Sequence, residues 1–334
     1  MSKKKLEILV PQYKESDEVI KPLLDSIAIQ QNIDFDDIGV IIVNDGTDIK
    51  LSDKLLSLYP FKIDYYQNEH KGVSATRNAC LDHSTAEYVM FCDIDDMFVS
   101  VIALWFIFQE IERTHFDTLV SVFMEEGRNP QTNEPIYYER GRQEQGGVDG
   151  TFVHGKVHRR KYLLENSIRW NENLTIHEDS YFNILCSSLT KNARYCPFVF
   201  YLWRWRDESV CRRDSKYMLK TYNNYIESNN ALVLQFLNRN LKEMAQHYVC
   251  FMVFDAYQVL NKKEWIEQEN QEYRLAVEKR FKEYYKNFAY LYKSSPDKMK
   301  NSLYAGIKNR SMNEGVFDEV ITLKDWIKHI EEEI

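Results

Sequence analysis

Glycine is scarce in this chain, and its scarcity excludes two common designs for binding phosphate groups. The 334 residues include only 11 glycines, and the first of them is Gly39. A dinucleotide-binding fold or a P-loop needs clustered glycines at the turn between its first strand and first helix. Here that turn reads PQYKESD and contains none. Neither design is therefore expected in this protein.

Paired cysteines and long apolar runs are also missing. The six cysteines form no Cys-x-x-Cys pair, so we expect buried, reduced thiols rather than a zinc site or a disulfide framework. The most apolar stretch, residues 99–108, is about half as long as a bilayer-spanning helix requires. Pro11 ends the short apolar run at the N-terminus, so we expect no signal peptide. The sequence predicts a cytoplasmic protein without a membrane span and leaves peripheral membrane association open.

The chain has no excess of basic residues. It contains 43 Lys and Arg against 51 Asp and Glu, a formal net charge of −8. A protein that coats nucleic acid needs a basic surface, so nucleic acid is a disfavoured partner unless a local basic groove exists. Hydrophobic residues make up 44% of the sequence, enough for a sizeable core. The composition predicts a folded protein and leaves oligomerisation open.

Strand-like and helix-like segments alternate through the first half of the chain. Residues 6–10, 38–45 and 87–93 resemble strands, and the second is a β-branched run typical of burial on both faces of a sheet. Helical segments lie between them, which predicts βαβ units and a mostly parallel, twisted sheet flanked by helices. We expect this α/β domain to occupy residues 1–214. A smaller helical module is expected over residues 215–334.

A polar segment interrupts the alternation. Residues 125–151 are rich in Gly, Asn and polar side chains, and predict a hairpin or a mobile loop over the ligand-binding edge of the sheet. A helix opening with His177, Glu178 and Asp179 follows, and the run FVFYLWRWR predicts the last strand of the domain.

Acidic residues gather where the predicted strands end. They are Glu15 and Asp17 after the first, Asp45 and Asp48 after the second, and Asp93, Asp95 and Asp96 after the later one. Ligands of parallel sheets bind beyond the carboxyl ends of the strands, so these groups are expected to meet in one crevice. Asp93 and Asp95 are separated by one residue and can both face a hard cation, Mn²⁺ or Mg²⁺. A solvated turn is the alternative explanation of the same cluster.

Five segments together resemble the family 2 glycosyltransferases, which have the GT-A fold. They are VPQYKESD, VIIVNDGTD, the stretch from NEHKG to CDIDDMF, HEDSYFN and YLWRWRDES, in that family's order over about residues 6–210. The resemblance implies an inverting enzyme that moves a sugar from a nucleotide-sugar, a UDP-sugar in particular, to a hydroxyl group. The acceptor would be a glycan or a cell-surface polymer, and Mn²⁺ or Mg²⁺ would assist. Residues 211–334 inherit nothing from the resemblance.

The same resemblance assigns roles to individual residues. The donor nucleotide would be contacted by Pro11, Tyr13, Glu15, Asp45, Lys71, Arg77, Asp93, Arg204 and Arg206. Tyr13 would stack on uracil, and Asp45 would accept a hydrogen bond from the imide N–H of the base. Asp93 and Asp95 would bind the metal ion. Asp179 would be the general base, with Glu178 as a supporting contact. Asn44 stands where the family often has Asp, so the nucleotide contact falls on Asp45.

Several of these positions have a second interpretation. Arg77 could pair with a neighbouring Asp instead of the diphosphate. Asp96 is expected to cap the next helix, with a contact to a sugar hydroxyl as the alternative. His154, His158 and His177 are interpreted as surface histidines, with a third metal ligand among them as the alternative.

Other functions also remain open for the chain as a whole. A metal-dependent phosphohydrolase could use Asp93 and Asp95 for different chemistry. Sugar transfer to a modified nucleic-acid base and a binding module without turnover are further alternatives.

Overall fold

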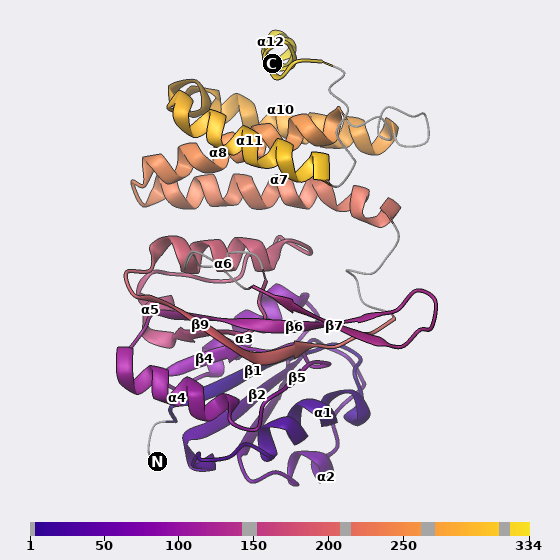
Figure 1. Cartoon of the computed structure of the whole chain (residues 1–334), viewed down its shortest axis with the longest axis vertical. Coiled ribbons are helices and arrows are strands. Elements are labelled where there is room, and N and C mark those ends of the chain that lie inside the picture. The colour runs from indigo at the N-terminus through magenta and orange to yellow at the C-terminus, as the bar shows by residue number, and fades with distance from the viewer. Residues whose placement is uncertain (1–3, 142–151, 208–214, 262–270, 314–320) are drawn as a thin grey trace. The chain divides into compact units, whose positions relative to one another are not determined.

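A nine-stranded sheet lies at the centre of the N-terminal part of the chain, counted over the described residues (Figure 1). The structure is a computed structural model that describes residues 4–141, 152–207, 215–261, 271–313 and 321–334. Two units make up the chain, residues 1–212 and residues 213–334. Each is described by itself below.

Four parallel strands form the first half of the sheet, in the spatial order β3-β2-β1-β4. They are β1 (Leu6–Gln12), β2 (Ile38–Asn44), β3 (Lys62–Gln67) and β4 (Tyr88–Phe91). Every residue of β2 and β4 is buried, which explains their uninterrupted apolar sequences. Because these strands are parallel, their carboxyl ends meet at one edge of the sheet. The predicted α/β class is confirmed.

Helices cover both faces of this sheet (Figure 1). They are α1 (Asp17–Ala28), α2 (Asp53–Leu56), α3 (Val73–His83), α4 (Ala103–Thr114), α5 (Arg160–Glu165) and α6 (Glu178–Leu189). Figure 1 shows α1, α2 and α4 on one face, and α3, α5 and α6 on the other. The helices α3 and α6 matter most for the site, because each begins at the edge where the parallel strands end.

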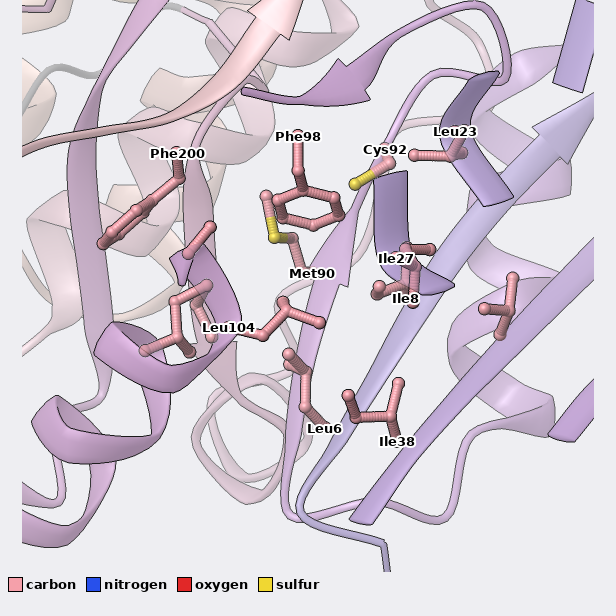
Figure 2. Close-up of a cluster of buried hydrophobic side chains, with 14 of the residues drawn as sticks. Leu6, Ile8, Leu23, Ile27, Ile38, Met90, Cys92, Phe98, Leu104 and Phe200 are labelled. Atoms are coloured by element: carbon pink, nitrogen blue, oxygen red, sulfur yellow. The ribbon is translucent and has the colours of Figure 1, made fainter. Parts of the chain in front are cut away.

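The core under α1 and α4 holds these elements in register (Figure 2). Leu23 and Ile27 of α1 and Leu104 of α4 are fully buried against the strand side chains Leu6 and Ile8. Burying a side chain of this size stabilises the fold by about 1.5–3 kcal/mol relative to leaving it exposed. The rigidity of this face fixes the positions of the strand ends that carry the acidic residues.

The second half of the sheet adds antiparallel pairs, of which the sequence pattern predicted only a hairpin. Its strands are β5 (Met97–Phe98), β6 (Thr118–Arg128), β7 (Pro135–Arg140), β8 (Lys156–Arg159) and β9 (Ala193–Trp203). Strand β8 pairs antiparallel with both β4 and β6, and β9 runs parallel to β6. Strands β6 and β7 form the hairpin predicted within residues 125–151. Residues 142–151 lie outside the described part of the chain.

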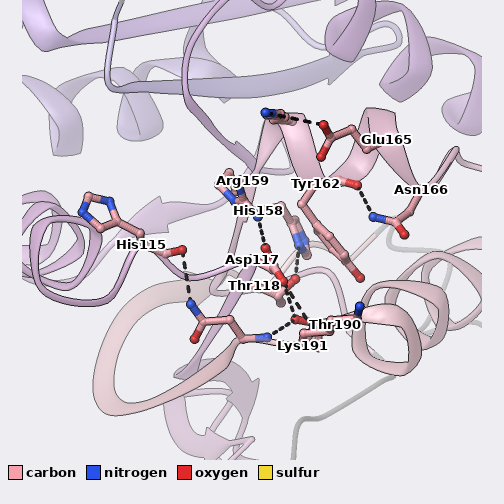
Figure 3. A network of polar contacts seen from close by, with 12 residues as sticks. His115, Asp117, Thr118, His158, Arg159, Tyr162, Glu165, Asn166, Thr190 and Lys191 are labelled. Atoms are coloured by element: carbon pink, nitrogen blue, oxygen red, sulfur yellow. Dashed lines mark hydrogen bonds and ion pairs between the residues drawn. The ribbon is translucent and has the colours of Figure 1, made fainter.

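A polar network ties the start of β6 to β8 and to the loop after α6 (Figure 3). The Asp117 carboxylate pairs with Arg159 and accepts hydrogen bonds from Thr190 Oγ1 and Lys191 N, both at 3.3 Å. His158 is buried beside it, and burial lowers the pKa of its imidazole to about 3. Because the His158 imidazole is buried, the prediction of a surface histidine is wrong for this residue.

The second unit is helical, as predicted. Its described helices are α7 (Ser215–Asn238), α8 (Lys242–Leu260), α10 (Gln271–Ser294), α11 (Asp297–Asn313) and α12 (Leu323–Glu333). Thr322 begins α12, because its hydroxyl accepts a hydrogen bond from Asp325 N at 3.2 Å. Trp326 of α12 stacks on Phe281 of α10 with ring centroids 5.2 Å apart. None of the helices that the structure describes is both long and apolar enough to cross a membrane.

Candidate active site

Arg77 on α3 joins the end of β4 to the start of α6. Its guanidinium is buried and lies 2.8 Å from Asp93 Oδ1 and 2.9 Å from Glu178 Oε1. The ring of Trp170 lies under the same group, with 4.4 Å between the ring centroid and the guanidinium carbon. Burial alone would lower the pKa of Arg77, but the two carboxylates outweigh burial and raise it above its usual value. The pairing with a neighbouring Asp, one of the two interpretations of Arg77, is present in the structure.

Arg206 holds a second pair of carboxylates together. Its Nη1 atom lies 3.2 Å from Asp95 Oδ2 and 3.4 Å from Glu15 Oε1. Arg204 donates from Nη1 to the Asp95 carbonyl oxygen at 3.2 Å. Burial, followed by the charge of Asp93, raises the pKa of Asp95. The structure therefore brings the end of β1, the turn after β4 and the segment after β9 to one place, as expected for a crevice at this edge.

Asp96 does not cap the next helix, so that prediction is wrong. α4 begins seven positions later, at Ala103, whereas Asp96 is fully buried. Its carboxylate accepts hydrogen bonds from the Tyr201 hydroxyl at 2.6 Å and from Arg204 N at 2.9 Å. Burial, followed by the charges of Asp93 and Asp95, raises the pKa of Asp96 well above its usual value. Its partners lie more than a hundred positions away, so the sequence offered no local signal for them.

A group suited to a divalent cation forms around Asp96. One ligand atom from each of Asp93, Asp96 and His154 lies within 4.8 Å of the others. Two carboxylates and an imidazole are suitable ligands for Mn²⁺. The carboxylates here repel one another in a partly dry environment, a situation that a bound cation would relieve. His154 is buried, so the surface interpretation is wrong for this histidine as well. Of the predicted metal pair, Asp93 belongs to this group, together with Asp96 and His154. The side chain of Asp95, the other member of the pair, contacts Arg206 instead.

The start of α6 presents Glu178 and Asp179. His177 precedes them with a left-handed backbone (φ 64°), a conformation that costs energy for a residue other than glycine and concentrates at functional sites. His177 is half-buried, and burial lowers the pKa of its imidazole to about 4. Glu178 pairs with Arg77, and adjacent helical residues point about 100° apart. Burial, followed by the charge of Glu178, raises the pKa of Asp179 to about 7.

Asp45, at the end of β2, organises the segment that leads into α3. Its Oδ1 atom accepts from Lys71 N at 2.8 Å, and its Oδ2 atom accepts from Gly72 N at 3.0 Å. His70 Nδ1 lies 2.9 Å from the same Oδ2 atom. The His70 ring stacks on Tyr13, with centroids 4.8 Å apart. Lys71 contributes its backbone here, because its ammonium group lies 4.0 Å from Glu69 on the surface.

Buried polar side chains beneath Asp45 support the loop that follows it. Asn44 donates from Nδ2 to Ile49 O at 2.8 Å and accepts from Thr47 N at 2.8 Å. Gln12, next to Pro11 on β1, accepts from the Tyr65 hydroxyl at 2.8 Å. Asn44, which departs from the family pattern, is therefore a hub that shapes the loop. Neither Gln12 nor His70 was singled out from the sequence, although His70 lies within the quoted segment NEHKG.

Gly46→Ala is expected to destabilise the protein by roughly 2–4 kcal/mol and to displace His70. Gly46 has φ of +71°, and a Cβ atom there would lie 2.3 Å from the backbone nitrogen of His70. Urea unfolding of the variant would measure the loss. Gly72→Ala is the matched control, since Gly72 also has a positive φ (+90°) but has open space where a Cβ would lie. Equal losses for the two variants would show that only backbone strain, and not the contact with His70, matters.

Comparisons with known proteins agree with this geometry. Residues 7–167 match the sequence profile of glycosyl transferase family 2. The "Glycosyltransferase GlyA" of Streptococcus pneumoniae is 33% identical over 94 residues, which cover 28% of this chain and only 13% of that protein. The structure is also similar to S. aureus TarS residues 1–349, with a TM-score of 0.62 at 16% identity, over 93% of this chain and 92% of that one. TarS in complex with UDP-GlcNAc gives the same score. At this identity the likeness concerns the fold.

The first unit thus has the GT-A fold. Residues 7–167 match glycosyl transferase family 2, as the three sequence segments inside that range predicted, and the segments HEDSYFN and YLWRWRDES lie outside it. The matched region contains the Asp45, Arg77 and Asp93–Asp96 positions and ends before Glu178. The roles of all these site residues, inside and outside the matched region, remain predictions.

Proposed function

We propose that this chain is an inverting glycosyltransferase that moves a sugar from a UDP-sugar to a hydroxyl group on a glycan or cell-surface polymer. One observation carries the proposal. The buried Arg77 bridges Asp93, after β4, to Glu178, beside the partly buried Asp179 at the start of α6. Asp179, a carboxylate that can take up a proton, thus lies next to the acidic residues around Asp93, where a leaving diphosphate would be held.

Different residues would bind the base, the diphosphate and the metal ion. Tyr13 and Asp45 lie together at the ends of β1 and β2 and would bind the base. Arg204 and Arg206 offer positive charge beside Asp95 and would contact the diphosphate. Asp93, Asp96 and His154 would hold the metal ion. When bound, a divalent cation offsets the negative charge that develops on the leaving diphosphate.

Asp179 would be the general base of the reaction. In a single displacement the acceptor hydroxyl loses its proton while its oxygen attacks the anomeric carbon. A carboxylate with a pKa of about 7 takes up that proton readily at neutral pH. The bond from the anomeric carbon to the diphosphate breaks as the new bond forms on the opposite side, and this single attack inverts the configuration of that carbon.

The direct test of this function measures the products. The protein is incubated with Mn²⁺ and each member of a panel of UDP-, GDP- and CDP-sugars, and the free nucleoside diphosphate is quantified. Release of UDP from a UDP-sugar is the expected result. Release of inorganic phosphate without a sugar requirement would support the phosphohydrolase alternative instead.

Asp93→Asn is expected to remove the metal-dependent part of UDP binding. For the parent we expect Mn²⁺ to strengthen UDP binding about tenfold or more, equivalent to at least 1.4 kcal/mol. The variant loses one of the three ligand atoms, so Mn²⁺ should no longer strengthen binding. Isothermal titration of UDP with and without Mn²⁺ measures the difference.

Asp82→Asn is the matched control for this experiment. Asp82 lies on α3 and pairs with Arg169 on the surface, away from the cluster. If Asp93→Asn keeps the Mn²⁺ effect of the parent, the acidic cluster is a structural turn and not a metal site.

The proposed cellular location is the cytoplasm. The described cysteines, Cys80, Cys92, Cys186, Cys196 and Cys250, are all buried and free of disulfides. This arrangement is consistent with a reducing compartment.

A further inference from the structure

His70 makes two contacts that the proposed function assigns to the nucleobase of the donor. Its imidazole stacks on the Tyr13 ring at 4.8 Å, with the two planes 21° apart. Its Nδ1 atom lies 2.9 Å from Asp45 Oδ2. An ionised carboxylate only accepts hydrogen bonds, so Nδ1 carries the proton and donates it. The imidazole is thus a flat ring whose N–H group points at Asp45, as the imide N–H of a uracil would.

The distance between the His70 and Tyr13 rings leaves no room for a nucleobase between them. Aromatic rings stack with centroids about 4.5–7 Å apart, so a third ring cannot enter between two whose centroids are 4.8 Å apart. The Lys14 ammonium group also lies 4.9 Å from the Tyr13 centroid. A base that stacks on Tyr13 and donates to Asp45 must therefore take the place of the imidazole.

Only the side chain of His70 is free to leave. Its backbone is fixed, because Gly46 packs against His70 N so closely that a Cβ would be 2.3 Å away. The side chain is 57% exposed, whereas that of Asp45 is 5% exposed. Rotation of the imidazole into solvent would open the subsite without moving the loop.

We propose that the His70 imidazole occupies the nucleobase subsite of the donor-free protein and is displaced when the donor binds. The inference rests on the proposed function and adds to it a residue that weakens donor binding. A ligand whose competent site is only partly populated binds more weakly by that fraction. The ring that displaces His70 must also offer an N–H group to Asp45. Uracil has a proton on its N3 atom and cytosine does not, so UDP should bind better than CDP.

The test compares His70→Ala with the parent by isothermal titration of UDP and CDP. Removing the competing ring should tighten UDP binding about 3- to 10-fold. The preference for UDP over CDP should remain, because Asp45 is unchanged. His70→Phe keeps a ring against Tyr13 and should bind UDP no more tightly than the parent. His83→Ala is the matched control, since His83 stacks on Tyr66 with centroids 3.7 Å apart, outside the subsite, and should leave UDP binding unchanged.

Each other outcome overturns the inference. Weaker UDP binding by His70→Ala would make His70 a contact of the bound base, and unchanged binding would place it outside the subsite. Either result leaves the proposed function standing, because UDP still binds. If neither the parent nor His70→Ala binds any of UDP, CDP, GDP or ADP, the proposed function fails and the inference fails with it.

Discussion

Asp179→Asn is expected to lower kcat about 10²- to 10⁴-fold, the loss typical of removing a general base. Asparagine has nearly the same shape as aspartate but cannot take up the proton of the acceptor hydroxyl. Donor and metal binding should be retained, because the nucleotide and cation positions lie on other residues. Steady-state transfer kinetics and UDP titration on the same preparation separate the two effects.

The pH dependence of the parent provides a second measurement of the same residue. Because burial raises the pKa of Asp179 to about 7, the base is progressively protonated as the pH falls below that value. Transfer by the parent should therefore decline below about pH 7, since only the carboxylate can act as a base.

Glu178→Gln is the comparison variant for this prediction. It should cost less activity, because Glu178 pairs with Arg77 and is not expected to meet the acceptor. Near-parental turnover by Asp179→Asn on a true acceptor would place the base elsewhere, with Glu178 or His177 as the next candidates.

The Asp179→Asn variant should also be more stable than the parent at high pH. The folded-state pKa of Asp179, about 7, lies above the ordinary value of 3.8. Between these values the folded protein keeps the proton and the unfolded chain releases it, so the stability of the parent falls as the pH rises. The asparagine side chain of the variant carries no charge at any pH. Urea unfolding at pH 8 should show the variant to be the more stable protein, and the difference should vanish as the pH falls below 3.8, where the folded and the unfolded parent are both protonated.

Arg77→Met is expected to destabilise the first unit by roughly 3–5 kcal/mol, the cost of breaking a buried ion pair from one side. The variant keeps much of the apolar stem over Trp170 but leaves Asp93 and Glu178 without their cation. Urea unfolding followed by far-ultraviolet circular dichroism measures the loss. Transfer activity should fall as well, because both carboxylates lose the group that orients them.

Arg169→Met is the matched control for Arg77. Arg169 makes an ion pair with Asp82, but both side chains are exposed, so its loss should cost about 1 kcal/mol or less. If Arg77→Met costs no more than Arg169→Met, the Arg77 cluster is solvated and does not hold α3 and α6 together. A double variant, Arg77→Met with Glu178→Gln, should recover part of the loss, since one buried carboxylate is then neutral.

The sequence by itself determined the elements of this protein and the edge at which its site lies. Hydrophobic periodicity and turn residues act over a few positions, so the strands around Ile8, Ile41 and Val89 and the helices between them could be predicted. Parallel strands end at one edge, so the position of Asp45 and of the turn at Asp93 at the same edge of the sheet could be predicted from topology alone. The likeness to family 2 glycosyltransferases came from short motifs of the same local kind.

Only the tertiary structure decided which side chains meet within that edge. Arg77 and Glu178 are 101 positions apart, and Asp96 and Tyr201 are 105 positions apart. Such pairs depend on the order of the strands, including the antiparallel β8 and the parallel return of β9, which no local pattern specifies. Burial is also a property of the whole fold. Asp96, expected to cap a helix, is instead buried and accepts hydrogen bonds, and the imidazole of His154 lies beside it. The raised pKa of Asp96 comes from desolvation and neighbouring charges, which arise only after the chain has folded.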